Sequence, residues 1–121
     1  MTMLGAVPLV LAGLMGAHGV ILAALAAHAA PGSGLDSAAH MLLFHGLAVM
    51  AASLLLDAGH LWRPLALLAI AGWLLGGIVF AGDIAFRAFA GHRLFPMAAP
   101  AGGTLLIAAW LAFAAAALKP R

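Results

Sequence analysis

The segment LALLAIAGWLLGGIVFAG, residues 65–82, decides the fold because it contains no charged side chain. A helix that crosses a membrane needs about 20 mainly apolar residues to span a hydrocarbon core about 30 Å thick. The run is continuously apolar, which excludes the alternating pattern of a transmembrane β-strand. The segment therefore predicts a transmembrane α-helix, which we expect to extend over residues 65–90.

Three further segments have the same character, and the sequence between them breaks helices. The predicted spans are residues 4–27, 37–56 and 98–118, and Gly and Pro residues lie between them, as in the stretch 31–34. Ser37 is the expected N-cap of the second span, and Pro64 suits the first turn of the third. The sequence thus predicts an all-α membrane protein with a single domain over residues 1–121, a four-transmembrane-helix antiparallel bundle.

The composition supports a chain dissolved in lipid. Hydrophobic residues make up 67% of the chain and charged residues 7%, whereas a soluble domain carries about 25% charged residues. The first span is longer than the apolar core of a signal peptide and no Lys or Arg precedes it, so we expect it to remain as a span. The partners we expect are the lipid bilayer and either further copies of the chain or a larger membrane complex.

Two classes of function are excluded or disfavoured by what the chain lacks. No run of Lys or Arg appears, which argues against a nucleic-acid partner. Cysteine is absent, and the sequence contains no nucleophile elbow, no paired carboxylates and no phosphate-binding glycine loop. We therefore expect a protein that is not an enzyme.

The distribution of basic residues predicts an orientation. With four spans, Arg63, Lys119 and Arg121 lie on the side of both termini, and Arg87 and Arg93 lie on the opposite side. Lys and Arg are enriched in cytoplasmic loops. The sequence therefore predicts a multi-pass protein of the bacterial inner (plasma) membrane, with both termini in the cytoplasm.

Small residues are the expected means of helix packing. Lipid removes the hydrophobic drive between helices, so that close approach through small residues replaces it. Gly72 and Gly76 form a GxxxG motif that Gly77 extends, and Gly102 and Gly103 open the fourth span. We expect these glycines to pack helices within one copy of the chain rather than to form a dedicated dimer face.

Two histidines are predicted to lie deep in the membrane. Counting at 1.5 Å per residue from the ends that face the first loop places both His18 and His45 about 12–14 Å below the surface. A deep pair of histidines on adjacent helices is what a b-type haem requires for axial ligation. His18 and His45 are therefore the candidate haem ligands.

A shallower group of polar side chains is expected near the same surface. His28, His40 and Asp83, together with His45, could bind a divalent ion such as zinc, copper or nickel, or a cuprous ion. A proton or ion conduit is a third use, because histidine changes charge near physiological pH. Asp83 and Arg87 have the i, i+4 spacing of an ion pair on one helix.

The ordinary role of intramembrane histidine is structural. Neutral imidazole binds carbonyl groups and bridges helices by hydrogen bonds. We therefore expect a non-enzymatic accessory or structural membrane subunit without a cofactor. The alternatives are a haem- or metal-binding protein with a histidine cluster at one face, and a proton or ion conduit.

Four short motifs resemble those of a known family. Residues 23–28 read AALAAH, residues 41–48 read MLLFHGLA, residues 80–82 read FAG, and PAGG at 100–103 is followed by Trp110. Together they resemble the YgdD-like family of small inner-membrane proteins, a domain of unknown function numbered 423. The resemblance covers nearly the whole chain and implies four spans, with no established activity, substrate or cofactor.

Not every polar residue matches the family pattern. His28 and His45 correspond to its two histidine positions. His18, His40 and Asp83 lie where the pattern has other residue types, and the family's Phe-Ser-Gly-Ser becomes FAGD here. The additional polar residues all lie toward one end of the predicted bundle, which keeps a ligand-binding relative among the hypotheses.

Overall fold

Four α-helices form nearly all of the chain in a computed structural model that describes residues 3–120, with side chains from residue 5 onward. They are α1 (Met3–His28), α2 (Leu35–Asp57), α3 (Arg63–Ala90) and α4 (Ala98–Ala116). Each is long and apolar enough to cross a membrane. The predicted all-α, four-span fold is confirmed, and the four predicted spans match the helices to within a few residues at each end.

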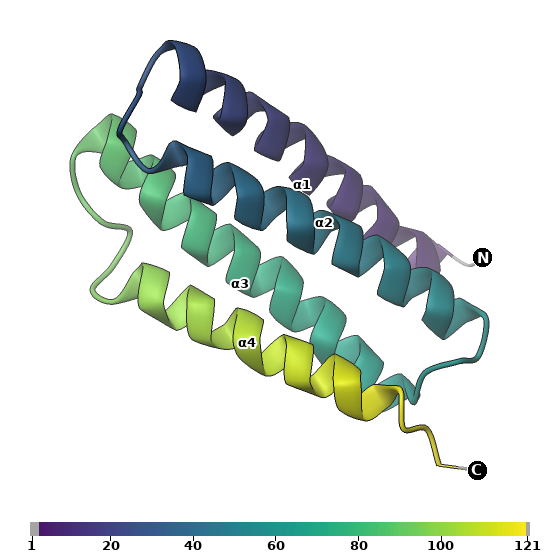
Figure 1. Cartoon of the computed structure of the whole chain (residues 1–121). Coiled ribbons are helices and arrows are strands. Elements are labelled where there is room, and N and C mark those ends of the chain that lie inside the picture. Colours follow the sequence, from purple (N-terminus) through teal and green to yellow (C-terminus); the bar gives the residue numbers. More distant parts are fainter. Residues whose placement is uncertain (1–2, 121) are drawn as a thin grey trace.

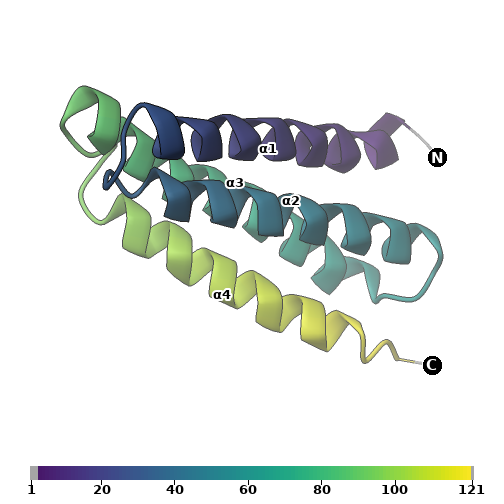
Figure 2. The ribbon, with the colours of Figure 1, turned by 45° about the horizontal axis from the view of Figure 1, so that its top comes forward.

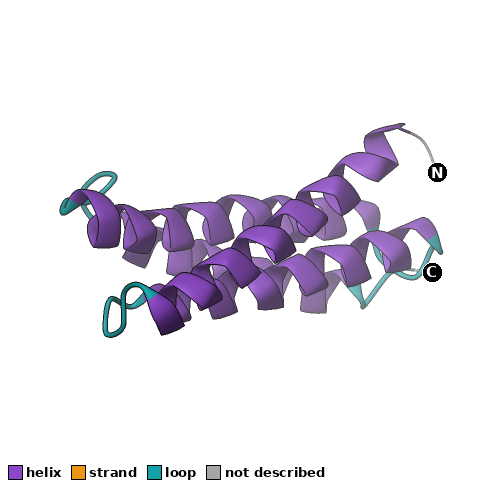
Figure 3. Cartoon of the chain, turned by 90° about the horizontal axis from the view of Figure 1, so that it is seen from above, coloured by secondary structure: helices purple, strands orange, loops and turns teal. Residues whose placement is uncertain are grey.

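The helices lie side by side in sequence order and alternate in direction (Figure 1). The α1–α2 and α3–α4 loops lie at one end, whereas the α2–α3 loop and both chain ends lie at the other. Helices α2 and α3 are central, α1 packs on α2, α4 packs on α3, and α1 meets α3 only slightly. Figure 2 shows α1 and α4 on opposite sides of the central pair. Figure 3, coloured by secondary structure, shows helices connected by loops. The antiparallel bundle is therefore open between α1 and α3.

The start of α2 differs from the prediction that Ser37 is its N-cap. The helix begins at Leu35, after Gly34 in the left-handed conformation (φ 85°). The N–H of Ser37 donates to the carbonyl of Gly34 (3.1 Å), so Ser37 already lies in the first turn. The Ser37 prediction is wrong because the helix is extended to bury Leu35, whose side chain is fully enclosed.

The core between α2, α3 and α4 is built mostly from small side chains around one large one. Trp73 is almost fully buried, and alanines from all three helices surround it, among them Ala52, Ala69 and Ala109. Small side chains let helix backbones approach closely, which strengthens dispersion contacts in a lipid environment. A second cluster, centred on Met15 and Leu42, joins α1 to the central pair.

Helices α3 and α4 touch through their glycines. A Cβ atom added to Gly102 would lie 2.7 Å from the backbone nitrogen of Phe80, and one on Gly76 would lie 2.9 Å from the carbonyl oxygen of Gly102. A Cβ on Gly72 would lie 2.8 Å from the Cβ of Ala109. Glycine is required where backbones come this close. The GxxxG motif thus lies inside the α3–α4 contact.

The other two glycines that the sequence singles out lie outside this backbone contact. A Cβ on Gly77 would meet the terminal methyl group of Met15 at 3.0 Å, so Gly77 faces α1. A Cβ on Gly103 would come no nearer than 3.9 Å to Phe80. Only three of the five glycines therefore set the distance between α3 and α4.

Candidate functional site: an apolar groove and two buried polar anchors

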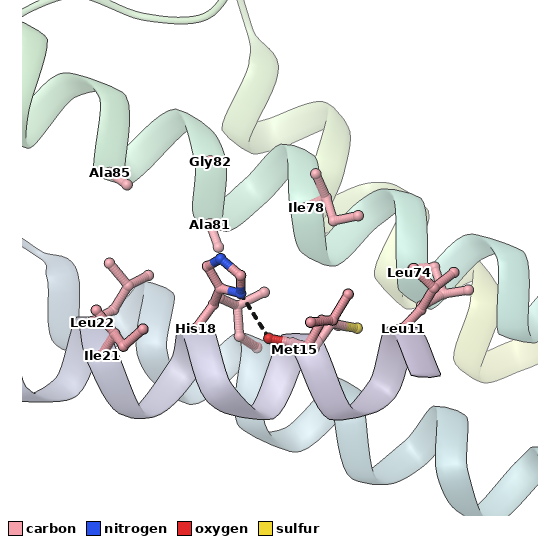
Figure 4. Close-up of a pocket in the computed structure, with 12 residues that line it drawn as sticks. Leu11, Met15, His18, Ile21, Leu22, Leu74, Ile78, Ala81, Gly82 and Ala85 are labelled. Carbon is pink, nitrogen blue, oxygen red and sulfur yellow. Dashed lines mark hydrogen bonds between the residues drawn. The ribbon is translucent and has the colours of Figure 1, made fainter. Parts of the chain in front are cut away.

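A groove of about 380 Å³ opens between α1 and α3, with Leu42 of α2 among its lining residues. Its walls are aliphatic apart from one imidazole: Leu14 and Ile21 line it from α1, and Leu74 and Ile78 line it from α3. Figure 4 shows the His18 ring extending from α1 toward Ala81 on α3. The groove exists because α1 is held by α2 alone along most of its length.

His18 gives the groove one polar atom. Its Nδ1 lies 2.8 Å from the carbonyl oxygen of Leu14, one turn earlier on α1 (Figure 4). A carbonyl oxygen only accepts, so Nδ1 carries a proton and donates, and Nε2 of the neutral ring offers a lone pair. Within the described residues no hydrogen bond reaches Nε2. The exposed imidazole can therefore accept a hydrogen bond from an occupant of the groove.

His45 is buried and both of its ring nitrogens are used. Its Nδ1 donates to the carbonyl of Met41 (2.7 Å), and its Nε2 accepts from the indole Nε1–H of Trp110 on α4 (3.0 Å). This pairing defines the neutral tautomer with the proton on Nδ1. His45 therefore links α2 to α4 across the core, which is a structural use of an intramembrane histidine.

Trp110, itself 43% exposed, belongs to an aromatic cluster around the buried Trp73. Its ring lies 4.6 Å from that of Trp73 between centroids, in an edge-to-face arrangement, and Trp73 also contacts Phe113 at 5.5 Å. The indole nitrogen of Trp73 is buried without a hydrogen-bond partner among the described residues. Such an unpaired donor costs about 1–3 kcal/mol, so the close ring packing around Trp73 stabilises the core against that cost.

Asp83 is the second buried polar anchor, and it organises the α3–α4 turn. Its side chain is completely enclosed. Oδ1 accepts from the N–H of Leu94 in the loop (3.0 Å), and Oδ2 accepts from the N–H of Ala99 in the first turn of α4 (3.2 Å). A carboxylate at a helix N-terminus satisfies free N–H groups and opposes the positive end of the helix dipole. Asp83 therefore acts as an N-cap supplied by another helix.

The first turn of α4 needs this cap because its own residues do not provide one. Met97 occupies the N-cap position with φ 64° and no side-chain cap. Ala98 N–H donates to Phe95, Pro100 has no N–H, and Ala101 N–H begins the intrahelical pattern by donating to Met97. The one remaining donor, Ala99, goes to Asp83. Every backbone donor of the turn is thus accounted for.

The predicted ion pair is present but weak. A guanidinium nitrogen of Arg87 lies 3.6 Å from Oδ2 of Asp83, and the Arg87 side chain is 41% exposed. This distance exceeds that of a hydrogen bond. The backbone N–H groups, rather than Arg87, are therefore the principal partners of Asp83.

The structure does not bring the predicted ligand sets together. His18 lines the α1–α3 groove, whereas His45 is bonded to α4, and haem ligation through its Nε2 would require the loss of the Trp110 hydrogen bond. His28 and His40 are exposed, whereas Asp83 is enclosed at the α3–α4 turn. No group of three or more His, Cys, Asp or Glu side chains placed to hold a metal ion occurs among the described residues.

Two features of the site could not be predicted from the sequence: the groove and the hydrogen-bond partners of Asp83. The groove depends on how α1 sits beside α3, and no spacing along the chain encodes that placement. The partners of Asp83 are backbone groups 11 and 16 residues later. Trp110 was singled out by the sequence, because it belongs to the last of the four motifs that resemble the family. The sequence did not predict that Trp110 would bond to His45.

These observations define a class: a small four-span membrane protein whose buried polar side chains serve to hold its helices together. The family follows from comparison with known sequences. Residues 12–103 match the family model described as a protein of unknown function (DUF423), and the chain belongs to this family. It is 31% identical to a UPF0382 membrane protein of Haemophilus influenzae, over 93% of this chain and 94% of the relative. No solved structure matches the chain.

Proposed function

We propose that the protein is a non-enzymatic accessory subunit of the bacterial inner membrane that packs against an apolar transmembrane helix of a partner, whose side chains enter the α1–α3 groove. From the distribution of Lys and Arg, we also propose that both termini lie in the cytoplasm. The observation that carries this proposal is the groove itself, which is apolar, lies on the side of the bundle and contains one unpaired hydrogen-bond acceptor, His18 Nε2.

The architecture of the bundle supports this role. Close packing and interhelical hydrogen bonds drive association of helices in lipid. The groove provides both, because its aliphatic walls give contact area and His18 Nε2 can accept from a Ser, Thr, Asn or Gln side chain of the partner. By contrast, both ring nitrogens of His45 are used within the protein, and the Ser53 and Thr104 hydroxyls donate to backbone carbonyls of their own helices.

Photo-crosslinking in native membranes tests the proposal. A photoreactive residue at Ile78, in the groove, is compared with one at Leu68, on a lipid-exposed face of the same helix. We expect Ile78 to yield one discrete protein adduct and Leu68 to yield lipid adducts only. Lipid adducts alone at both positions would refute the proposal.

A matched pair of substitutions shows whether the adduct depends on the groove. Ala85 lines the groove, whereas Ala71 is an exposed alanine elsewhere on α3. With the photoreactive residue at Ile78, Ala85→Leu should reduce the adduct at least tenfold by filling the groove, and Ala71→Leu should leave it unchanged. An adduct that survives Ala85→Leu would place the partner outside the groove and contradict the proposal.

A further inference from the structure

A second cleft, separate from the groove, lies between α3 and α4 at the end that carries the α3–α4 loop. It has a volume of about 500 Å³ and is bordered by two arginines, Arg87 of α3 and Arg93 of the loop. Phe80 on α3 and Gly103 and Ile107 on α4 also line it. The cleft therefore combines a doubly cationic part with an apolar part.

Most of the positive charge in this cleft is not neutralised by the protein. Asp83 is the acid beside Arg87, and both of its oxygens already accept from backbone N–H groups. Arg87 approaches it only to 3.6 Å. Arg93 has no ion pair among the described residues. Two guanidinium groups thus share at most one carboxylate, and a planar guanidinium is well suited to bind phosphate oxygens through paired hydrogen bonds.

The loop that carries Arg93 has the character of an interfacial segment. Leu94, Phe95 and Met97 are 43%, 47% and 61% exposed. Exposed apolar side chains next to an arginine are typical of chain that lies between the headgroups and the acyl chains of a bilayer, with the charged group reaching toward the headgroups. This composition favours a position of Arg93 near the lipid phosphates.

The apolar part of the cleft fits an acyl chain below that headgroup. Phe80 precedes Arg87 by seven positions on α3, which corresponds to about 10 Å along a helix. Gly103 has no side chain and therefore leaves space on the surface of α4. Ile107 continues the apolar lining one turn further from the loop. A lipid with its phosphate at the arginines would lay its chain along these residues.

We propose that this cleft is a binding site for an anionic phospholipid, with Arg87 and Arg93 holding the phosphate and the face formed by Phe80, Gly103 and Ile107 holding one acyl chain. The site is independent of the groove between α1 and α3. It distinguishes anionic from zwitterionic lipid because the cleft carries a net positive charge.

Native mass spectrometry of the detergent-purified chain tests the site. The protein is mixed with equal amounts of phosphatidylglycerol and phosphatidylcholine of matched chain length, and the bound fractions are compared. We expect phosphatidylglycerol to be retained several-fold more than phosphatidylcholine. Arg87→Gln and Arg93→Gln should each lower phosphatidylglycerol retention by about fivefold, as expected for one cation at a lipid surface. Equal retention of the two lipids would overturn the proposal.

Arg63→Gln is the matched control, because it removes the same charge at the opposite end of the bundle. It should leave retention unchanged, and a loss equal to that of the cleft variants would show a general charge effect and refute the site. Circular dichroism checks the fold, and Arg93→Gln alone decides the outcome if Arg87→Gln fails to fold. Millimolar inorganic phosphate distinguishes the two phosphate sources: complete displacement of the lipid by phosphate would refute the role of the acyl chain.

Discussion

At the scale of single residues, this membrane protein uses its few buried polar groups to join helices. His45 and Trp110 link α2 to α4, and Asp83 links α3 to the start of α4. Each bond replaces one that water would provide outside the membrane, and an unsatisfied polar group in hydrocarbon costs several kcal/mol. The positions of polar residues in a span therefore indicate where helices are held together as readily as where ligands bind.

Asp83 provides the clearest test at this scale. Asp83→Asn keeps the shape of the side chain but turns one acceptor into an NH₂ donor that faces a backbone N–H. We expect it to lower the free energy of unfolding by about 2 kcal/mol, since an unpaired buried donor costs about 1–3 kcal/mol. The measurement is unfolding by SDS in mixed micelles, followed by circular dichroism.

Arg87→Gln is the control for Asp83. Because Arg87 is 41% exposed and 3.6 Å from the carboxylate, its loss should cost less than about 1 kcal/mol. Equal losses for the two variants would mean that the ion pair, and not the cap, stabilises the α3–α4 turn.

The sequence predicted the residues of this site better than their partners. The i, i+4 spacing predicted the Asp83–Arg87 pair, because helix geometry alone places those side chains together. The bonds from Asp83 to Leu94 and Ala99 depend on the path of a loop, and the bond from His45 to Trp110 depends on the rotation of two helices. Neither has a periodic signature. The hypothesis that His18 and His45 share a ligand rested on their depth alone. In the structure His18 lines the α1–α3 groove, whereas His45 accepts a hydrogen bond from Trp110 of α4.

At the scale of helices, hydropathy and breaker residues predicted the bounds closely, since hydrocarbon thickness sets the length of each span. The exception was the start of α2, where a left-handed glycine and the burial of Leu35 determine the first turn. The close contact between α3 and α4 depends instead on the absence of a Cβ atom at Gly72, Gly76 and Gly102. The GxxxG motif indicated α3, but the partner glycine on α4 was not implied by the motif.

Two neighbouring glycines on α4 test the α3–α4 contact. Gly102→Ala places a methyl group 2.7 Å from a backbone nitrogen of α3, and backbone cannot move aside as a flexible side chain can. We expect a loss of about 2 kcal/mol, in the range of overpacked cores. Gly103→Ala, with its nearest neighbour at 3.9 Å, should be neutral or stabilising by up to about 1 kcal/mol through its higher helix propensity. The SDS unfolding assay measures both, and a Gly102→Ala variant as stable as the Gly103→Ala variant would contradict the contact.

At the scale of the whole molecule, each outer helix rests mainly on one central helix: α1 on α2, and α4 on α3. Helix α1 rests on α2 and barely meets α3, whereas α4 is joined to α3 by close glycine contacts and to α2 by a hydrogen bond. Side-chain hydrogen bonds thus join α2, α3 and α4. The α1 side is where a membrane-embedded partner would find unoccupied helix surface.

The orientation of the molecule is testable because the chain has no cysteine. Single cysteines at Gly91, in the α3–α4 loop, and at Lys119, near the C-terminus, lie at opposite ends of the bundle. Positive charge favours the end that holds Arg63 and Lys119 as the cytoplasmic one. We expect a membrane-impermeant maleimide to label Gly91→Cys in intact cells and Lys119→Cys only after lysis. The reverse pattern would show the opposite orientation.

The edge-to-face stacking of Trp73 on Trp110 has an optical consequence. Two indoles held this close and at a fixed angle couple their electronic transitions, which produces a paired band of opposite signs in the circular dichroism of the aromatic chromophores. Because one ring belongs to α3 and the other to α4, the band exists only while those helices are docked. The chain thus contains an intrinsic spectroscopic reporter of its own assembly, and no dye or label is needed to follow it.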